Sequence, residues 1–343
     1  MTSLLAGDLG GTKTLLAIYS DKDSSLDCLH FQRFTSKEWS SLRVMLRYFL
    51  TNLPDKISYP DYGCIAVAGK VQNNEALITN LPWRLKGKDL AAEMGITHIE
   101  LVNDFAVLVH GLRHFSAGQQ VVLQDGEHLP GPSAILGAGT GLGMARGIPF
   151  ANELIALPSE GGHREFSPRT EEEWQLAVWL RDDLDLKRLS IERVVSGTGL
   201  GHIASWLLQK PEASGHPLRL TALSWRQNHN IVDLPAHVSK AAAKGDRLME
   251  HALQLWLGAY GAAAGDLILQ ELCSGGLWIG GGTAAKQLSG LRSPAFLDPM
   301  RAKGRFEPFV SSIPVHALID PGVGLFSAAC RARMLVELGG TLT

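Results

Sequence analysis

Residues 6–14 read Ala6-Gly7-Asp8-Leu9-Gly10-Gly11-Thr12-Lys13-Thr14, and a short apolar run flanks them on each side. The apolar runs are residues 4–6 and 15–18, so the pattern predicts a strand, a tight turn and a returning strand. Glycine permits the backbone angles that a tight turn requires. Backbone amides in such a turn can approach the oxygens of a phosphate group closely.

The same pattern recurs about one domain further along the chain. Residues 137–143 read Gly137-Ala138-Gly139-Thr140-Gly141-Leu142-Gly143, between an apolar run at 134–136 and Met144-Ala145. Two such turns predict two related α/β domains that face each other across a cleft. We expect a small domain formed by residues 1–111 with about 320–343, and a large domain formed by residues 112–319.

Composition describes an ordinary globular protein with no strong charge bias. The 343 residues are 45% hydrophobic and 19% charged, with a formal net charge of −2. No large basic surface follows from that balance, so we expect neither nucleic acid nor membrane as a partner. Four cysteines lie far apart without a C-x-x-C pair, which disfavours a metal cage or a disulfide framework: Cys28, Cys64, Cys273 and Cys330.

Neither the N-terminal residues nor the longest apolar stretch indicates export or a membrane anchor. The N-terminus has no basic segment and reaches Asp8 too early for a signal peptide. The longest apolar stretch, residues 253–265, ends at Asp266 and is too short to span a bilayer, so it predicts a buried helix. We therefore expect a cytoplasmic protein.

The two commonest phosphate-binding motifs are absent from the chain. No segment matches G-x-x-x-x-G-K-[ST], and no glycine cluster matches G-x-G-x-x-G. A P-loop enzyme and a dinucleotide enzyme are therefore both disfavoured. Asp8 ends the first predicted strand, where a carboxylate suits a magnesium ion held directly or through water beside phosphates.

Three segments together resemble the motifs of a known superfamily. Residues 6–14 resemble the first phosphate motif of the actin-like ATPases, residues 137–143 the second, and Gly280-Gly281-Gly282-Thr283 the adenosine motif. The whole chain is similar to the bacterial glucokinases, in the hexokinase branch, which implies a two-domain actin-like ATPase (ribonuclease H-like) α/β fold with an interdomain cleft. The nucleotide-binding residues that the resemblance implies are Asp8, Gly10, Gly11, Thr12, Lys13, Gly139, Thr140, Gly141, Gly281 and Gly282.

Residues 101–105, Leu101-Val102-Asn103-Asp104-Phe105, resemble the catalytic segment of that family. The resemblance implies that Asp104 is the general base that removes the proton of the sugar 6-hydroxyl, and that Asn103 hydrogen-bonds a neighbouring hydroxyl. Taken alone, Asn-Asp ahead of a helix expected at 105–112 is more typical of an N-cap. Only the flanking phosphate motifs favour the catalytic interpretation.

The sugar-binding residues are likewise implied by resemblance. Ser159-Glu160-Gly161-Gly162-His163 resembles the family's sugar signature, and Glu192 stands in a segment resembling the one that supplies another carboxylate. Carboxylates and imidazoles suit a polyol because they accept or donate several hydrogen bonds. Asn80, in a turn-like stretch, is a further candidate at the rim of the sugar site; an ordinary turn explains it equally well.

The implied reaction is a direct in-line transfer from ATP with Mg²⁺, yielding glucose 6-phosphate for glycolysis. The related ROK branch carries zinc-binding cysteines after its histidine, whereas no cysteine follows His163 before Cys273, so zinc is not expected. His110 and His114 have metal-ligand spacing, but no partner motif lies near them in the sequence, which favours a structural pair.

Several alternatives stay open from the sequence. The acceptor can be mannose, glucosamine or a related hexose, and the phosphoryl donor can be ADP or polyphosphate, because the named residues read shared groups. A non-catalytic sugar-binding regulator and an actin- or chaperone-like ATPase are the competing classes. A homodimer is compatible with the resemblance. Residues 212–235 show no clear period, and we interpret them as surface structure.

Overall fold

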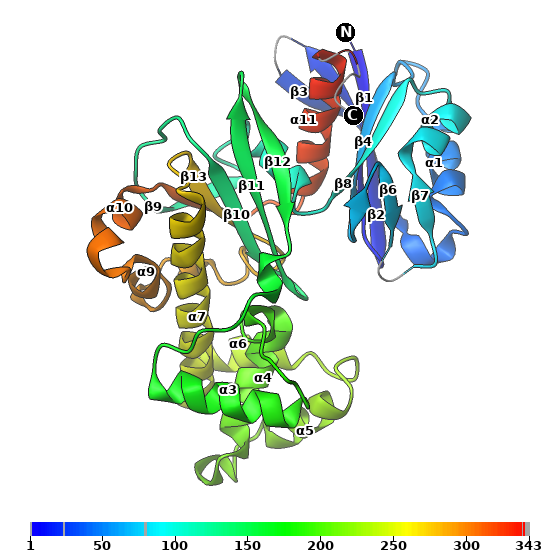
Figure 1. The fold of residues 1–343 in the computed structure, drawn as a ribbon. Helices are drawn as coiled ribbons and strands as arrows, with labels where there is room; N and C mark the ends of the chain where they lie inside the picture. The colour runs from blue at the N-terminus through cyan, green and yellow to red at the C-terminus, as the bar shows by residue number, and fades with distance from the viewer. Residues whose placement is uncertain (1, 23–24, 79–80, 338, 340–343) are drawn as a thin grey trace. The chain divides into compact units, whose positions relative to one another are not determined.

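The computed structural model describes residues 2–22, 25–78, 81–337 and 339 (Figure 1). The chain divides into two compact units. The first unit comprises Met1–Gln119, Ala145–Pro158 and Asp320–Thr343, and the second comprises Gln120–Met144 and Ser159–Ile319. Sheets and helices alternate through both units, which confirms the predicted α/β class. Compact units of this kind are not the same as domains. The domain boundaries that we expect from the sequence therefore stay a prediction.

A five-stranded sheet forms the centre of the first unit, in the order β3-β2-β1-β4-β8. β1 pairs antiparallel with β2 and parallel with β4, and β4 pairs parallel with β8. Parallel pairing brings the carboxyl ends of β1, β4 and β8 to one edge, where binding sites of α/β proteins commonly lie. The strands are β1 (Thr2–Leu9), β2 (Lys13–Lys22), β3 (Ser25–Thr35), β4 (Tyr62–Val67) and β8 (His98–Asn103).

Helices cover the centre of this sheet because β1, β2 and β4 are runs of largely aliphatic residues buried on both faces. Helix α11 packs on β1 and β4, while α1 and α2 share an apolar cluster with the opposite face. Ser41 caps α1 by accepting a hydrogen bond from the amide of Val44. The unit also contains η1 (Ser36–Glu38), α1 (Leu42–Thr51), β5 (Val71–Gln72), β6 (Glu75–Leu77), β7 (Arg84–Lys86), α2 (Gly87–Met94), η2 (Val107–Gly111) and α11 (Val323–Glu337).

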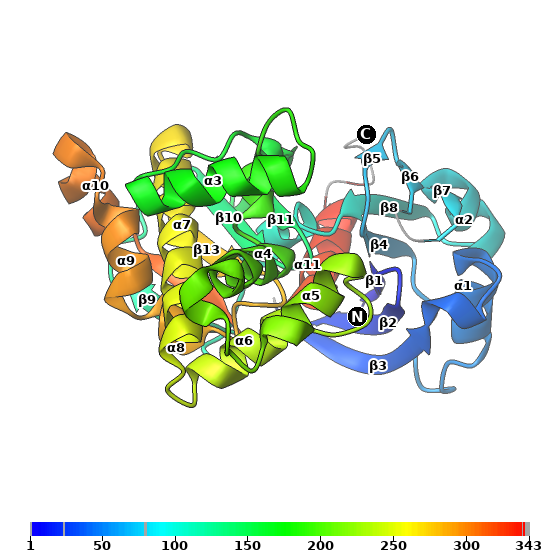
Figure 2. The ribbon, with the colours of Figure 1, turned by 90° about the horizontal axis from the view of Figure 1, so that it is seen from below.

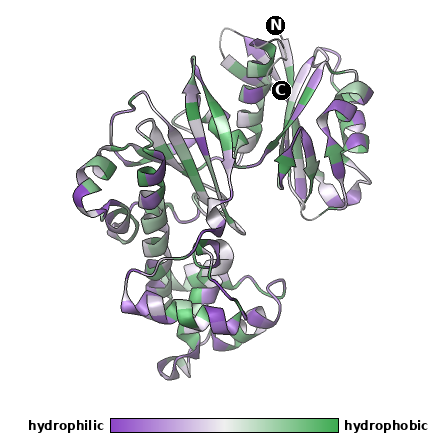
Figure 3. Ribbon diagram, viewed as in Figure 1, coloured by the Kyte–Doolittle hydropathy of each residue, from purple (hydrophilic) through white to green (hydrophobic). Residues whose placement is uncertain are grey.

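The second sheet has six strands in the order β12-β11-β10-β13-β14-β9. β10, β13 and β14 run parallel, and β9 pairs antiparallel with β14. The hydrophobic core draws residues from these strands and from the helices around them, and both carry hydrophobic segments in Figure 3. The strands are β9 (Gln120–Gln124), β10 (Ser133–Ala138), β11 (Leu142–Phe150), β12 (Glu153–Ser159), β13 (Gly276–Gly280) and β14 (Val315–Leu318).

Helix α7 is the central helix of the second unit. Trp256 and Tyr260 on α7 are almost fully buried, and the Tyr260 hydroxyl accepts a hydrogen bond of 3.1 Å from the amide of Ala138 at the end of β10. Helices α4, α5 and α6 gather around one end of α7 (Figures 1 and 2). The helices are η3 (Gly161–His163), α3 (Glu171–Asp183), η4 (Ile191–Arg193), α4 (Gly197–Gln209), η5 (Pro211–Ala213), α5 (Arg219–Gln227), α6 (Leu234–Ala242), α7 (Arg247–Glu271), α8 (Leu288–Leu291), α9 (Pro294–Arg301), η6 (Gly304–Phe306) and α10 (Glu307–Ser312).

Two sequence interpretations need correction, and one is refined. The helix expected at 105–112 is a short 3-10 helix, η2, because Asn103 caps a tight turn there rather than a full α-helix. Residues 212–235 are not simply surface structure: α5 lies among them, and Trp225 is only 2% exposed. The apolar run at 253–265 lies in α7, which by length and composition is able to cross a membrane, but 72% of its apolar window is buried inside the protein.

Candidate active site

The first glycine turn joins β1 to β2, and the buried Ser36 stabilises it through hydrogen bonds. The amide of Gly10 donates to the carbonyl of Lys13 at 3.0 Å, which closes the turn. Ser36 donates from its hydroxyl to the carbonyl of Gly10 at 2.7 Å and from its amide to the carbonyl of Thr12 at 3.0 Å. Among the described residues, the amides of Gly11 and Thr12 have no hydrogen-bond partner, so they are available to phosphate oxygens.

Asp8 lies at the end of β1, beside this turn. Its carboxylate faces Gly324 in the first turn of α11, where an added Cβ would meet Oδ2 at 3.2 Å. Burial raises the pKa of Asp8, and the charge of Lys13 partly offsets that rise. A desolvated carboxyl group of this kind is stabilised as an anion by a cation close to it.

Asp104 follows β8, the strand at the end of the same parallel series. Its amide donates to the carbonyl of Val67 at 3.0 Å, and its Oδ1 accepts from the side-chain amide of Asn103 at 3.0 Å and from the amide of Phe105 at 3.1 Å. Burial, followed by the negative charge of Asp8, raises the pKa of Asp104 to about 6. A carboxyl group with that pKa is a stronger base than an ordinary aspartate and is still ionised at neutral pH.

The side chain of Asn103 binds the surrounding backbone. Its Oδ1 accepts from the amides of Phe105 and Ala106 at 3.0 and 3.1 Å, which is the capping arrangement expected of Asn at this position. Its amide also donates to the carbonyl of Gly69 at 3.2 Å. Asn103 is therefore a structural support of Asp104 in this structure, and its predicted contact with a sugar hydroxyl stays a prediction.

The second glycine turn joins β10 to β11 in the second unit. The amide of Gly139 donates to the carbonyl of Gly141 at 2.8 Å, and the carbonyl of Gly139 accepts from the amide of Gly197 at 2.8 Å. Within the described part of the chain, the amides of Thr140 and Gly141 donate to no other group. This turn thus resembles the first one in leaving adjacent N–H groups for an anion.

The third glycine segment follows β13 and packs against the second turn. Gly281 has a φ of 83°, and a Cβ at this position would collide with the carbonyl of Ala138, so only glycine fits here. Thr283 donates to that carbonyl from its amide at 3.2 Å and from its hydroxyl at 2.7 Å. The second turn and the Gly280–Thr283 segment therefore meet at the ends of neighbouring strands.

A pocket of about 1080 Å³ opens beside these two segments, large enough for a nucleotide. Its walls include Gly139, Thr140 and Gly282, which the sequence motifs predicted to bind a nucleotide, and also Thr283 of the adenosine-like segment. Other walls come from α5, from the segment between α5 and α6, and from the residues just before α8, and the sequence indicated no site role for them. Their main members are Trp225, His229, Asp233, Lys286 and Gln287.

Trp225 and His229 form an aromatic wall of this pocket. Their rings stack with centroids 4.0 Å apart and an interplanar angle of 12°. Trp225 is buried, whereas His229 lies at the surface of the pocket. In the sequence, Trp225 and His229 lie in a stretch without periodicity. Such a stretch predicts no particular secondary structure, so the sequence did not indicate that the two residues belong to a site.

The predicted sugar residues of the second unit lie on two short 3-10 helices. Glu160 and His163 bracket η3, where Nε2 of His163 lies 3.9 Å from Oε2 of Glu160, and both side chains are exposed. Glu192 lies on η4, and its Oε2 accepts a hydrogen bond of 3.0 Å from the amide of Leu142, the first residue of β11 after the second glycine turn. The structure therefore joins Glu192 to the chain directly after the second glycine turn, while the side chains of Glu160 and His163 stay exposed.

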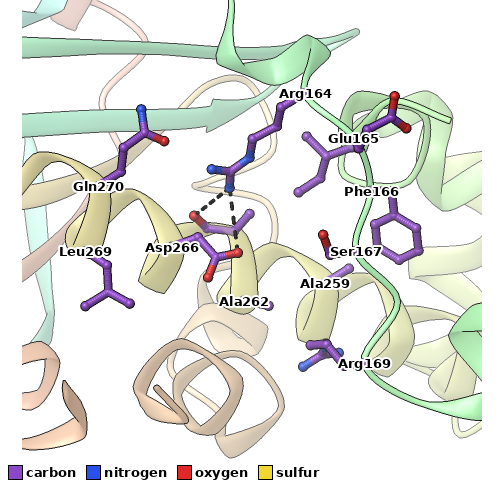
Figure 4. A pocket seen from close by; sticks show the side chains of 12 residues that line it. Arg164, Glu165, Phe166, Ser167, Arg169, Ala259, Ala262, Asp266, Leu269 and Gln270 are labelled. Carbon is purple, nitrogen blue, oxygen red and sulfur yellow. Dashed lines mark hydrogen bonds and ion pairs between the residues drawn. The ribbon is translucent and has the colours of Figure 1, made fainter. Parts of the chain in front are cut away.

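We call residues 159–163 the sugar segment. A second cavity, of about 440 Å³, lies between the residues that follow this segment and one face of α7 (Figure 4). Arg164, which directly follows His163, lines it and donates to the carbonyl of Ala263 at 3.4 Å. The same guanidinium lies 3.9 Å from Asp266, whose carboxylate also binds Lys303 at 2.6 Å. Asp266 thus joins the chain that follows the sugar segment to α7 and to Lys303.

Asn80 lies outside the described residues. No group of three or more His, Cys, Asp or Glu side chains able to hold a metal is found in the described ranges. His110 and His114 have separate surroundings: burial lowers the pKa of His110 to about 3, while Nε2 of His114 lies 3.2 Å from Oε2 of Glu153. The pair is therefore structural, as its sequence context favoured.

Known proteins resemble this chain over almost its whole length. The family model of glucokinases matches residues 5–335. A glucokinase from Nostoc sp. is 43% identical over 345 residues, which cover 97% of this chain and 100% of that protein.

Solved structures show the same likeness in three dimensions. The crystal structure of a glucokinase from an Antarctic psychrotroph has a TM-score of 0.84 and 26% identity, covering 97% of this chain and 99% of that one. A ROK family glucokinase from Streptomyces griseus, crystallised with glucose and AMPPNP, has a TM-score of 0.60 and 20% identity, with coverage of 97% and 99%. The second likeness concerns the fold alone.

Proposed function

Because this chain belongs to the glucokinase family, we propose that it transfers a phosphoryl group from ATP to the 6-hydroxyl of glucose. The matches also confirm the predicted actin-like ATPase fold. A nucleotide analogue and glucose are bound by the Streptomyces griseus relative, which supports both substrates here. The proposed base, Asp104, belongs to the first unit, and the proposed sugar-binding residues Glu160, His163 and Glu192 belong to the second.

The observation that carries this function is the environment of Asp104. A sugar hydroxyl is a weak nucleophile until a base removes its proton as the new bond to phosphorus forms. Asp104 has a pKa raised to about 6, and hydrogen bonds from Asn103 and Phe105 hold its Oδ1. That arrangement fixes the carboxylate and leaves Oδ2 to accept the proton of the 6-hydroxyl.

The sugar is held by Glu160, His163 and Glu192. A carboxylate accepts hydrogen bonds from two hydroxyls, and an imidazole can donate or accept, so the three side chains suit a polyol. Glu160 and His163 are already close enough to share one sugar edge, with 3.9 Å between Oε2 and Nε2. Groups that must pair with hydroxyls discriminate strongly against ligands that lack them.

The nucleotide is held by backbone groups more than by side chains. Two amides in each glycine turn are free to donate to phosphate oxygens, and they act as preorganised dipoles as charge develops on the transferring group. The pocket bounded by the Gly280–Thr283 segment and by Trp225 and His229 suits the adenosine part. Direct in-line transfer then needs no covalent enzyme intermediate.

Magnesium fits the first unit on the chemistry of its donors. Asp8 is a buried carboxyl group whose pKa is raised, and its charge in turn raises the pKa of Asp104, so a cation there would relieve both. Asp8 would hold the ion directly or through water. When bound, magnesium supplies charge neutralisation on the phosphates.

We place the enzyme in the cytoplasm, as a homodimer or a monomer.

One assay separates this function from its competitors. The purified chain is incubated with ATP and Mg²⁺ together with glucose, mannose or glucosamine, and both sugar phosphate and free phosphate are measured. We expect glucose 6-phosphate at the highest kcat/KM and little free phosphate. Free phosphate without sugar phosphate would support an ATPase that changes shape, and sugar binding without either product would support a regulator.

A further inference from the structure

The carboxylate of Glu192 forms part of the second glycine turn as well as of the sugar site. Its Oε2 accepts the 3.0 Å hydrogen bond from the amide of Leu142, the residue that follows the turn. A Cβ added at Gly141 would collide with the same oxygen, so the carboxylate lies directly against the turn backbone. Glu192 therefore supports the shape of a segment that we assign to phosphate binding.

The other hydrogen bonds that the described residues make in this turn join neutral groups. They run from the amide of Gly139 to the carbonyl of Gly141 and from the amide of Gly197 to the carbonyl of Gly139, both at 2.8 Å, and from the hydroxyl of Thr198 to the carbonyl of Thr140 at 3.3 Å. The Glu192 bond is charge-assisted and anchors the end at which β11 begins. Charge-assisted bonds are roughly twice as strong as neutral ones, so this contact has a large share in fixing the turn.

Glu192 also keeps acceptor capacity for a sugar. Among the described residues its Oε1 accepts no hydrogen bond, while an ionised carboxylate offers about four lone-pair positions. The sugar segment meets the same part of β11, because a Cβ at Gly162 would collide with the carbonyl of Leu142. Leu142, the residue that follows the phosphate turn, thus contacts both sugar-binding segments of its unit.

We propose that Glu192 is a positioning residue for the phosphate turn, through which glucose and the nucleotide affect each other's affinity. The inference rests on the proposed function and extends it. Sugar bound to Oε1 fixes the Glu192 side chain, and that side chain fixes the amide of Leu142. By linkage, the factor by which glucose tightens nucleotide binding equals the factor by which the nucleotide tightens glucose binding.

The first test measures nucleotide affinity in the absence of sugar, with a non-hydrolysable ATP analogue and Mg²⁺. A residue that only binds sugar would not affect this affinity. We expect Glu192→Ala to weaken analogue binding about tenfold, as loss of a hydrogen bond to a charged group implies. Glu160→Ala, a matched control from the same sugar set without a contact to the turn, should leave analogue affinity unchanged.

A conservative variant separates positioning from misfolding. Glu192→Gln keeps an oxygen that accepts from Leu142, so we expect analogue affinity within about threefold of the parent chain. Glucose affinity should fall in both Glu192 variants, because the carboxylate is lost. Analogue affinity unchanged in Glu192→Ala, or lost equally in Glu192→Gln and Glu192→Ala, would overturn the proposal.

The reciprocal test changes the turn and measures glucose affinity without a nucleotide. Gly141→Ala pushes against Glu192 and should weaken glucose binding about fivefold or more, although Gly141 is assigned to phosphate binding. Gly139→Ala is the matched control in the same turn, since its Cβ would meet nothing within 4 Å, and glucose affinity should stay unchanged. Equal glucose affinities in the two variants would contradict the proposal.

Failure of this inference is distinguishable from failure of the proposed function. If the parent chain forms glucose 6-phosphate but Glu192→Ala binds the analogue normally, only the positioning role is wrong. If the parent chain forms no sugar phosphate with any hexose, the proposed function is wrong, and the binding measurements still show whether Glu192 supports the turn.

Discussion

The side-chain amide of Asn103 donates a hydrogen bond of 3.0 Å to Oδ1 of Asp104. Asn103 is itself fixed, because its Oδ1 accepts from the amides of Phe105 and Ala106. The orientation of Asp104 is therefore set by the backbone that follows β8. A base placed in this way can direct its second oxygen to a hydroxyl without losing further side-chain freedom.

The pH dependence of turnover should report the pKa of Asp104. A base acts only when deprotonated, so kcat/KM for glucose should be full above about pH 7 and fall as the pH drops through about 6. A magnesium ion held by Asp8 would offset the charge of Asp8, so the contribution of Asp8 is measured on the metal-free chain. There Asp8→Asn removes a negative charge that raises the pKa of Asp104, and NMR titration of Asp104 between pH 4.5 and 8 should give a lower pKa than in the parent chain; an equal or higher pKa contradicts it.

Ser36 should control the first glycine turn although it lies outside every phosphate motif. Ser36→Ala loses the 2.7 Å bond to the carbonyl of Gly10 and should raise KM for ATP about fivefold, as for a lost hydrogen bond of about 1 kcal/mol. Ser41→Ala is the control, because it removes the cap of α1 and costs about 1 kcal/mol of stability without affecting KM. Equal KM values for the two variants would exclude the role of Ser36.

His229 should contribute to nucleotide binding through the aromatic wall. His229→Ala removes a ring stacked on Trp225 at 4.0 Å and should raise KM for ATP about threefold or more, with KM for glucose unchanged. His237→Ala, an exposed histidine on α6 that does not line the pocket, serves as the control. A change in KM for glucose alone would show that the pocket does not hold the nucleotide.

Asp266 should contribute to the folding stability of the second unit and not to the proposed reaction. Asp266→Asn removes the carboxylate that binds Lys303 at 2.6 Å, and the Lys303 side chain is only 11% exposed, so the free energy of unfolding should fall by about 1–2 kcal/mol. Asp298→Asn on the exposed face of α9 is the control and should cost less than about 0.5 kcal/mol. Denaturant unfolding of both variants measures the difference.

The glycine turns could be predicted because their signature is local. A tight turn between two apolar strands needs glycine at the turn and apolar residues on both sides. The residue types at 6–14 and 137–143 therefore predict both turns and the strands that flank them. The strand before Asn103 and the buried helix around residues 253–265 follow from composition in the same way. Residue roles came from the motifs and not from periodicity.

The supports of these motifs could not be predicted, because they come from distant parts of the chain. Ser36 reaches Gly10 from 26 positions away, and Glu192 reaches Leu142 from 50. Nothing in the residues around Ser36 distinguishes it from an ordinary turn serine. Trp225 and His229 lie in a stretch without periodicity, and only the packing of α5 against α4 and α6 places them at the nucleotide pocket.

The most direct test of the account is the turnover of Asp104→Asn with glucose, ATP and Mg²⁺, measured as glucose 6-phosphate formed. Asparagine keeps the size of the side chain but cannot accept the proton, so we expect kcat to fall by about a hundredfold or more. Glucose and analogue affinities, measured by calorimetry, should stay within about threefold of the parent chain. A kcat within about threefold of the parent value, with both ligands bound normally, would show that Asp104 is not the base.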